Sequence, residues 1–459
     1  MKKTNYLLYI AVIVLLFSCS EDFLEFTPPN DIATTNFWAT QNDAEAGVVG
    51  CYDALQPDSY YGFDYFVLGD VRSDNSFAGG DNSNNFAIDN FNLRPTNEIT
   101  TRFWRQLYTA IGRTNIAIDR ITPMDNGLFE DGRKDALLGE VHFLRGLHYF
   151  NLVRLFGGVP LVVNETLSLD PDEIQVPRSS ENQIYQQVIA DLQNAITLLG
   201  GKDQEAGRAT VGAAEGLLAK VQLTLGNNQA VLSLTSSVMQ RGFSLLPSFE
   251  SLFDQQNKTN NEVLFAVQYN GGQEGNVFPE LILPVPEASF EFIKFNTPTP
   301  NSEQLFEDDD LRKASSLVNR NDILYVFKWR EGAAFNSSDY SIVLRYADVL
   351  LMRAEALNLS GNTGEAIVLL NQIRNRAGLP DYAGPTSQAA IDTAILQERR
   401  LELMFEGQRW FDLKRKGLAT AQQAIQTAKG ISIQSFQLLF PVPQGEIDRN
   451  ERLEQNTGY

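Results

Sequence analysis

The sequence predicts a mostly α-helical protein: a tetratricopeptide-like helical-repeat scaffold with long irregular loops and a few short strands. Three observations predict it. Apolar residues recur at three- and four-residue spacing through most of the chain. Two helix pairs, far apart in sequence, resemble each other. Between them, two long stretches rich in Gly, Asn, Asp, Pro and aromatic residues break the helical pattern.

Residues 1–18 have the pattern of a secretory signal peptide. Lys2 and Lys3 precede an apolar run over residues 6–17, which is too short to span a membrane comfortably. The run ends in LFSC, which resembles a bacterial lipobox, so Cys19 is the predicted lipid attachment site. A secreted protein with a chance cysteine is the alternative. Residues 19–39 would then be a lipidated tether, and residues 40–459 a single domain.

The charge of the chain limits its partners. The formal net charge is −20, and removal of Lys2 and Lys3 with the signal peptide makes the mature chain more acidic still. Such a chain repels nucleic acid and anionic lipid. No later apolar stretch is long enough to span a membrane, so the lipid on Cys19 is the one expected membrane contact. Cys51, the other cysteine, is predicted to be a small buried apolar residue.

Apolar periodicity places helices along most of the chain. The predicted helices cover residues 40–55, 98–121, 131–156, 180–199, 210–225, 228–241, 341–359, 363–376, 387–405 and 418–428. Ser180 with Gln183, and Asn362 with Glu365, fit capping boxes at helix starts. The helical scaffold is therefore assigned to residues 98–241 and 341–428.

Two of these helix pairs carry a repeated string. AKVQLTLGN at residues 219–227 matches AEALNLSGN at residues 354–362, each before a second amphipathic helix. In such a repeat Gly226 and Gly361 end the first helix in a left-handed conformation. Independent helical hairpins that converged on the same pattern are the alternative.

Residues 56–97 and 242–340 are the two candidate ligand loops, because long loops on a rigid scaffold commonly carry binding sites. The second contains short β-like runs at residues 263–268 and 323–329. All four Trp residues lie outside the first loop, and Trp38, Trp104 and Trp410 fall in helical patterns typical of a core.

Several strings, in order along the chain, together resemble the SusD/RagB family of outer-membrane nutrient-binding lipoproteins. They are LRGLHYFNLVRLFGGVPL (144–161), LRYADVLLMRAEALN (344–358), LNQIRNRAGLP (370–380), ERRLELMFEGQRWFDLKR (398–415) and QNTGY (455–459). Their charged residues stand at helix spacing beside apolar stripes, which favours buried ion pairs over a ligand site. These strings identify a scaffold.

The resemblance implies a non-enzymatic protein, anchored by lipid to the outer membrane and facing the extracellular side. It implies capture of a glycan, an oligosaccharide or polysaccharide, that is passed to a partner TonB-dependent (SusC-like) transporter. A peptide-binding member of the same family is the alternative, and a surface glycoside hydrolase or an adhesive scaffold are further ones. Ser20, Glu21 and Asp22 resemble an acidic surface-export tag, although an ordinary linker has the same composition. No cofactor is expected.

A glycan site needs aromatic rings for the C–H faces of sugars and planar polar groups for their hydroxyls. The loop after residue 69 offers both, and the middle region offers a second, weaker set. The candidate ligand-binding residues are Arg72, Asp74, Asn75, Phe77, Phe86, Phe91, Asn92, Tyr269, Asn270 and Phe278. The alternative is a loop pinned to the scaffold by its own buried Phe residues. In the starch-type members that the resemblance implies, the aromatic arc includes Trp, which this loop lacks.

Other chemistry is disfavoured. Asp81 to Asn85 alternate oxygen ligands but lack the Gly and final Glu of a calcium loop. His142 and His148 are six apart, so they do not share a helix face as zinc ligands would. The acidic run at residues 307–310 is expected to be a solvated turn, not the paired carboxylates of a glycosidase. We therefore expect no metal site and no catalytic residues.

Overall fold

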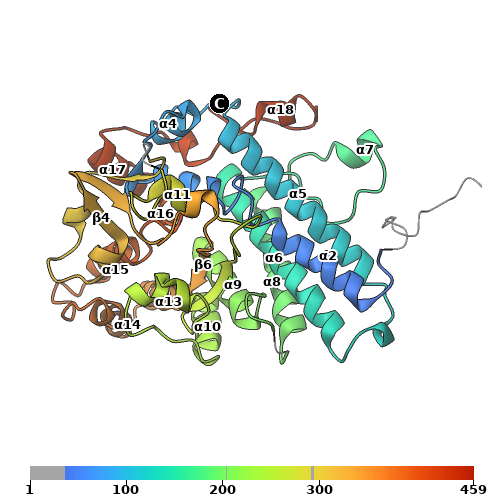
Figure 1. Ribbon diagram of the computed structural model, residues 1–459, viewed down its shortest axis with the longest axis horizontal. Coiled ribbons are helices and arrows are strands. Elements are labelled where there is room, and N and C mark those ends of the chain that lie inside the picture. The colour runs from blue at the N-terminus through green and yellow to red at the C-terminus, as the bar shows by residue number, and fades with distance from the viewer. Residues whose placement is uncertain (1–36, 203, 291–293) are drawn as a thin grey trace, which may run out of the picture.

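The computed structural model describes residues 37–202, 204–290 and 294–459 (Figure 1). Helices dominate these ranges, and the strands in them are short and form two-stranded sheets. The predicted fold class, mostly α-helical with a few short strands, is therefore confirmed. The predicted signal peptide and Cys19 lie outside the described residues.

Four long helices pack together at one end of the molecule (Figure 1). They are α2 (Gln41–Asp53), α5 (Glu98–Ile121), α6 (Arg133–Phe156) and α8 (Glu181–Leu199). Helix α6 packs against both α5 and α8. Gly139 and Gly146 of α6 face α8: a Cβ would lie 2.8 Å from Leu199 at the first and 3.1 Å from Leu192 at the second. These glycines allow the two helices to approach closely.

The two predicted repeats are two helical hairpins. They are α9 (Val211–Thr224) with α10 (Asn228–Met239), and α13 (Tyr346–Leu359) with α14 (Thr363–Arg376). Gly226 and Gly361 have φ of +75° and +86°, as predicted. After each glycine an asparagine N–H donates across the helix end, Asn227 to the carbonyl of Gln222 and Asn362 to that of Leu357, both at 2.9 Å. Helix α10 packs against α13, which joins the hairpins into one scaffold.

The C-terminal part adds three helices beside α13 and α14. They are α15 (Gln388–Glu402), α16 (Arg409–Arg415) and α17 (Leu418–Lys429). The helix predicted over residues 387–405 ends earlier, because the chain turns through Phe405 (φ +66°) and Gly407 (φ +71°). This turn passes over the early loop, since a Cβ on Gly69 would lie 2.2 Å from the carbonyl oxygen of Gly407.

The remaining elements are short and lie mostly in the two irregular regions. The helices are α3 (Asp64–Phe66), η2 (Val67–Val71), α4 (Ser83–Asp89), η3 (Asn126–Leu128), α7 (Pro171–Ile174), η4 (Glu250–Phe253), η5 (Gln255–Asn257), α11 (Phe278–Ile282), η6 (Ser302–Leu305), α12 (Arg312–Ser316), η7 (Ala333–Phe335), η8 (Ser435–Leu438) and α18 (Gln444–Ile447). The antiparallel strand pairs are β1 (Ser76–Phe77) with β3 (Thr297–Pro298), β2 (Val263–Val267) with β6 (Ser341–Arg345), and β4 (Leu317–Arg320) with β5 (Ile323–Val326).

Two further local predictions were wrong. The helix predicted over residues 341–359 begins only at Tyr346, because the preceding five residues form β6 against β2. The predicted capping box at Asn362 is absent, since its side chain makes no cap hydrogen bond. The box at Ser180 and Gln183 is present, and Thr40 with Asp43 forms another that was not predicted.

Buried ion pairs join the C-terminal helices to the strands. Arg345, which is 1% exposed, contacts the carboxylates of Glu262, Glu402 and Glu406. Arg399 bridges Asp348 and Asp412 in the same way. The family-like strings therefore act as a scaffold, as their helix spacing indicated, because Arg345 and Arg399 are each buried against carboxylates of other elements.

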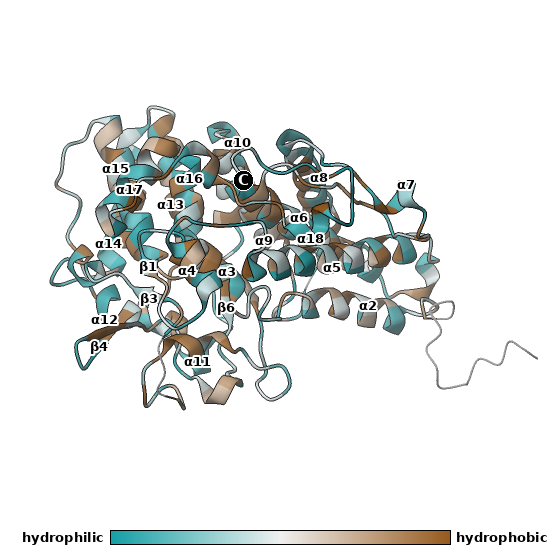
Figure 2. Ribbon diagram, turned by 90° about the horizontal axis from the view of Figure 1, so that it is seen from above, coloured by the Kyte–Doolittle hydropathy of each residue, from teal (hydrophilic) through white to brown (hydrophobic). Residues whose placement is uncertain are grey.

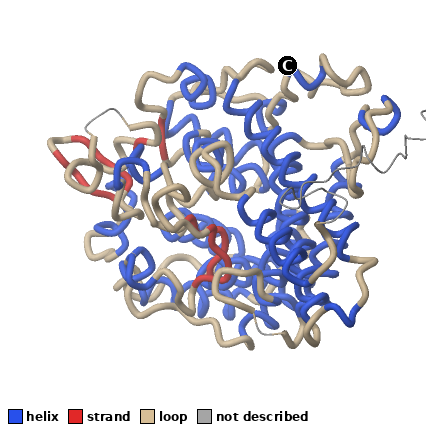
Figure 3. Tube along the Cα trace, turned by 45° about the vertical axis from the view of Figure 1, so that its right-hand side comes forward, coloured by secondary structure: helices blue, strands red, loops and turns tan. Residues whose placement is uncertain are grey.

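Figure 2 shows how the layers are arranged. Helices α8, α10 and α15 lie on one side, whereas α11 and β4 with their loops lie on the opposite side. Figure 3 shows that the strands lie among the loops, except for β2 and β6, which pack against the helices: the ring of Phe265 in β2 lies 4.8 Å from that of Phe143 in α6. Among the described residues no helix is long and apolar enough to cross a membrane. Cys51 is fully buried in the core, as predicted.

Candidate functional site

Arg72, the first of the candidate site residues, is completely buried. Its guanidinium lies 3.8 Å from the ring centroid of Phe91 and donates to the carbonyls of Ile88 (3.0 Å) and Gln437 (2.8 Å). Burial lowers its pKa to about 10, although Tyr459 and Asp89 oppose this shift. A guanidinium with these partners ties the early loop to the C-terminal segment and is not presented to solvent.

Asp74 and Asn75 are buried beneath α15 and α16. The carboxylate of Asp74 accepts from Arg409 at 2.8 and 3.0 Å and lies 3.1 Å from Arg400. Although burial opposes it, these two arginines lower the pKa of Asp74 to about 2. The Oδ1 atom of Asn75 accepts from Arg400 at 2.8 Å. Both residues therefore fix arginines, and Asp74 also lines a groove described below.

The four remaining candidates in this loop differ in exposure. Phe91 is buried, with its ring 5.6 Å from that of Trp410. Phe86 is half-buried against the core, and Phe77 is half-buried in β1. Asn92 is exposed. Of these, Phe77, Phe86 and Asn92 are accessible to a ligand.

The middle-region candidates divide in the same way. Tyr269 is buried and its hydroxyl donates to the carbonyl of Gln56 at 3.1 Å. Phe278 is buried and stacks on Phe66 at 4.4 Å. Asn270 is exposed and donates to Glu274 at 2.8 Å beside a groove along α2. The buried members match the alternative of a loop pinned by its own side chains, and ligand binding by the accessible members stays a prediction.

An exposed aromatic pair lies elsewhere in the middle region. Phe290 follows α11 and Phe335 ends η7; their rings stack with centroids 5.7 Å apart and planes 25° from parallel. The two residues are 47% and 36% exposed, and they are the phenylalanines among the exposed large hydrophobic residues of the described chain. We call this pair the aromatic platform.

A buried carboxylate holds the two platform loops together. Glu280 of α11 is fully buried; its Oε1 accepts from the N–H of Phe290 at 2.8 Å and its Oε2 from that of Ala334 at 3.0 Å. A Cβ on Gly332 would lie 2.2 Å from Oε2, so a larger residue at this position would displace the carboxylate from its two N–H partners. The backbone at residues 333–335 has positive φ throughout. The platform is therefore preorganised by one side chain that bonds both loops.

Sequence reasoning identified the middle region but missed Phe290, Phe335 and Glu280. Each Phe follows small residues in a loop, AS before Phe290 and GAA before Phe335. This pattern could have indicated an exposed ring, because small neighbouring residues cover little of a large aromatic side chain. The role of Glu280 carried no such signal, because its partners lie ten and more residues away.

The structure also places the residues that the sequence suggested for metal binding or for catalysis. Asn82 caps α4 and accepts from the N–H of Asn84, so the Asp81 segment is a helix start. His142 lies 2.9 Å from Asp191, and His148 is buried against Tyr60. Among the described residues no three His, Cys, Asp or Glu are placed to hold a metal ion. The acidic run was predicted to be a solvated turn, and this is wrong for Asp310, which is buried against Arg312.

Two family models match the chain: one described as the SusD family over residues 301–459, and one described as "Starch-binding associating with outer membrane" over residues 22–223. SusD-like protein P2 of Formosa agariphila is 28% identical and is matched over the full length of both chains. The chain belongs to the SusD/RagB family. The resemblance of its ordered strings is thereby confirmed.

Solved SusD-like structures share the fold. A SusD superfamily protein from Bacteroides vulgatus aligns with a TM-score of 0.82 and 24% identity, covering 92% of this chain and all of that one. A laminarin-binding SusD-like protein aligns with a TM-score of 0.78 and 27% identity over the same shares. The SusD/RagB chain described here is thus a member of a glycan-binding family associated with the outer membrane.

Proposed function

We propose that this protein is a surface lipoprotein that captures a glycan on the aromatic platform and passes it, without chemistry, to a partner TonB-dependent transporter. The platform carries the proposal. Two stacked rings, on residues that are 47% and 36% exposed, offer apolar surface that suits the C–H surfaces of pyranose rings. The exposed Asn270 and Asn92 remain candidate partners for sugar hydroxyls.

Membership of the SusD/RagB family supports a glycan ligand, and the laminarin-binding relative makes laminarin oligosaccharides the first to test. Calorimetric titration of the purified protein should give saturable binding of at least one defined glycan. Chromatography of the same mixtures should recover the glycan unchanged. Release of shorter sugars would instead support the glycoside hydrolase, and binding of peptides alone would support the peptide-binding alternative.

Anchoring and partnership complete the proposal. The lipobox predicts that Cys19→Ala releases the protein from the outer membrane, which fractionation at high salt would detect. Pull-down from native membranes in mild detergent should recover a TonB-dependent transporter in near-equal amount. A mutant that stays in the membrane fraction contradicts the anchor, and recovery of the lipoprotein alone contradicts the partnership.

A further inference from the structure

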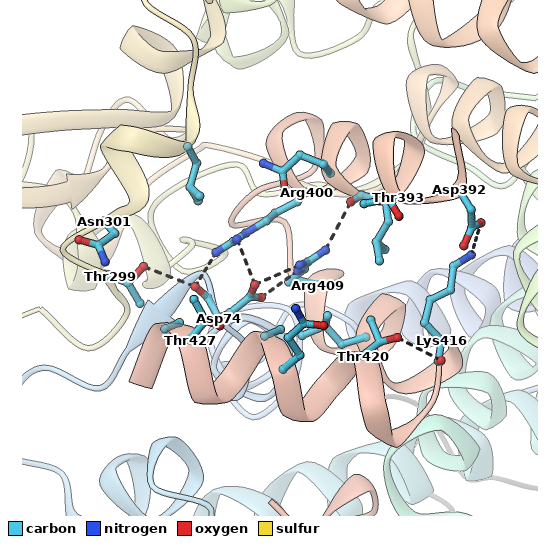
Figure 4. A pocket seen from close by; sticks show the side chains of 17 residues that line it. Asp74, Thr299, Asn301, Asp392, Thr393, Arg400, Arg409, Lys416, Thr420 and Thr427 are labelled. Carbon is cyan, nitrogen blue, oxygen red and sulfur yellow. Dashed lines mark hydrogen bonds and ion pairs between the residues drawn. The ribbon is translucent and has the colours of Figure 1, made fainter. Parts of the chain in front are cut away.

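A groove that contains none of the platform residues lies between α15 and α17 (Figure 4). Helix α16 forms its floor, and the segment from Thr299 to Leu305 closes one end. Its volume is about 420 Å³. Ligand pockets of proteins range from roughly 300 to 1,000 Å³. This groove is therefore large enough for one or two sugar rings.

The walls of the groove offer unused hydrogen-bonding groups. Gln397 of α15 faces it from one side, and Gln423 and Thr427 of α17 from the other, with Asn301 at the closed end. The side chains of these four residues make no hydrogen bond within the described part of the chain. Apolar side chains also line the groove: Leu305, Leu396, Leu413 and Ala424. A lining of amide, hydroxyl and apolar groups suits a ligand with both hydroxyls and C–H faces.

The closed end carries excess positive charge. Arg400 and Arg409 share the single carboxylate of Asp74, and Arg400 also donates to the side chain of Asn75 and the carbonyl of Asp74. Figure 4 shows both guanidinium groups turned toward Asp74 along the groove. Each guanidinium has five N–H donors, and the hydrogen bonds and ion pairs of Arg400 and Arg409 leave at least one donor on each without a partner among the described residues.

The charges at the other end are balanced. Lys416 lies 2.6 Å from Asp392 and 2.8 Å from Glu355.

At the closed end, burial lowers the pKa of Arg400 to about 10; Asp74 opposes this shift and Arg409 reinforces it. Arg400 is still charged at neutral pH, and an added anion would stabilise that charge. In a chain of net charge −20, this is a local site of opposite sign.

We infer that this groove binds a sugar that carries a carboxylate, as in a one- or two-residue uronic acid unit, with the carboxylate at Arg400 and Arg409. A planar carboxylate matches the paired N–H donors of a guanidinium. The ring hydroxyls would bond Gln397, Gln423 and Thr427, and the C–H faces would contact Leu396 and Ala424. The inference stands independently of the platform, since it uses none of the platform residues.

The test compares two disaccharides that differ only in whether C6 of each ring is a carboxylate or an alcohol. Digalacturonic acid should bind the full chain with saturable heat, more weakly as salt rises. The same disaccharide with its carboxyl groups reduced to alcohols should bind at least about tenfold more weakly, because a charge-assisted pair is lost. Equal binding of both ligands, or no binding of the acid, would overturn the inference. So would an acidic dipeptide that binds better than the acidic sugar.

Variants locate the site without touching the buried ion pairs. Gln397→Ala with Gln423→Ala should weaken digalacturonic acid binding by about tenfold, since two hydrogen bonds are lost. Gln426→Ala, an exposed residue of α17 that does not line the groove, is the matched control and should bind as the parent does. Phe335→Ala should also leave this binding unchanged. Loss of binding in Phe335→Ala but not in the glutamine pair would place the acid on the platform and overturn the inference.

Discussion

Two irregular regions of this SusD/RagB protein have similar compositions but differ in how far their aromatic rings are exposed. The early region, residues 56–97, buries most of its rings, among them Tyr60, Phe66 and Phe91. The middle region buries Phe278 but exposes Phe290 and Phe335. The C-terminal segment packs over the early region, where Arg72 donates to the carbonyl of Gln437, whereas the two platform residues are 47% and 36% exposed. Aromatic content therefore does not identify a binding surface: what packs over the rings decides it.

We expect the largest loss of stability where a buried ring is removed. Phe278→Ala removes a ring that is fully buried between Phe66 and Trp329. We expect the free energy of unfolding to fall by about 3 to 5 kcal/mol. Denaturant unfolding measures this directly. Phe335→Ala is the matched control, and a similar loss in both variants would remove the distinction between the regions.

Arg72→Ala tests whether the early loop is scaffold. The change removes hydrogen bonds to Ile88 and Gln437 and the contact with the Phe91 ring. We expect a loss of roughly 2 to 4 kcal/mol in stability, since the buried carbonyls lose a charged donor. Phe77→Ala, at a half-buried residue of β1, should cost less. An Arg72→Ala protein that melts with the parent but binds glycan weakly would return the site to this loop.

Asp70 makes the stability of the fold decrease as pH rises from the acidic to the neutral range. Burial raises its pKa from 3.8 to about 8, although its Oδ2 accepts from the N–H of Gly407 at 3.0 Å. A raised pKa contributes stability that is fully present below 3.8 and is lost as pH rises through about 8. Asp70→Asn removes this dependence.

The variant should therefore gain on the parent between pH 5 and pH 9, by on the order of a few kcal/mol in unfolding free energy. Asp81→Asn, at an exposed aspartate, is the control. Unfolding measured at both pH values decides the matter. Parallel pH profiles for the parent and Asp70→Asn would contradict a buried, largely protonated carboxyl at this position.

These residues show how far the sequence predicts the fold. Helices α5 and α14 begin and end where their apolar periodicity does, because each buries one face along its whole length. Gly226 and Gly361 have the left-handed φ that their repeat required. Strand β6 was missed because its apolar residues continue directly into α13, and only pairing with β2 distinguishes the two.

The site was less predictable, because its determinants are distant in sequence. Arg72 has the residue type of a ligand-binding group, but the carbonyl of Gln437, 365 positions away, satisfies it. Asp74 meets Arg409 across 335 positions. Gln397 and Gln423 lie on the polar faces of two amphipathic helices, and the sequence of each helix alone predicts only a solvent-facing surface. The groove exists because α15 and α17 lie beside each other.

The central claim is that the aromatic platform holds the glycan. Its most direct test is one titration series with a glycan that binds the parent, comparing the parent with Phe290→Ala/Phe335→Ala and with the exposed-leucine control Leu169→Ala. We predict that the double variant keeps its unfolding free energy within about 1 kcal/mol, because the two residues are 47% and 36% exposed, and that it loses at least about tenfold in affinity. Parent-like affinity in a folded double variant would contradict it.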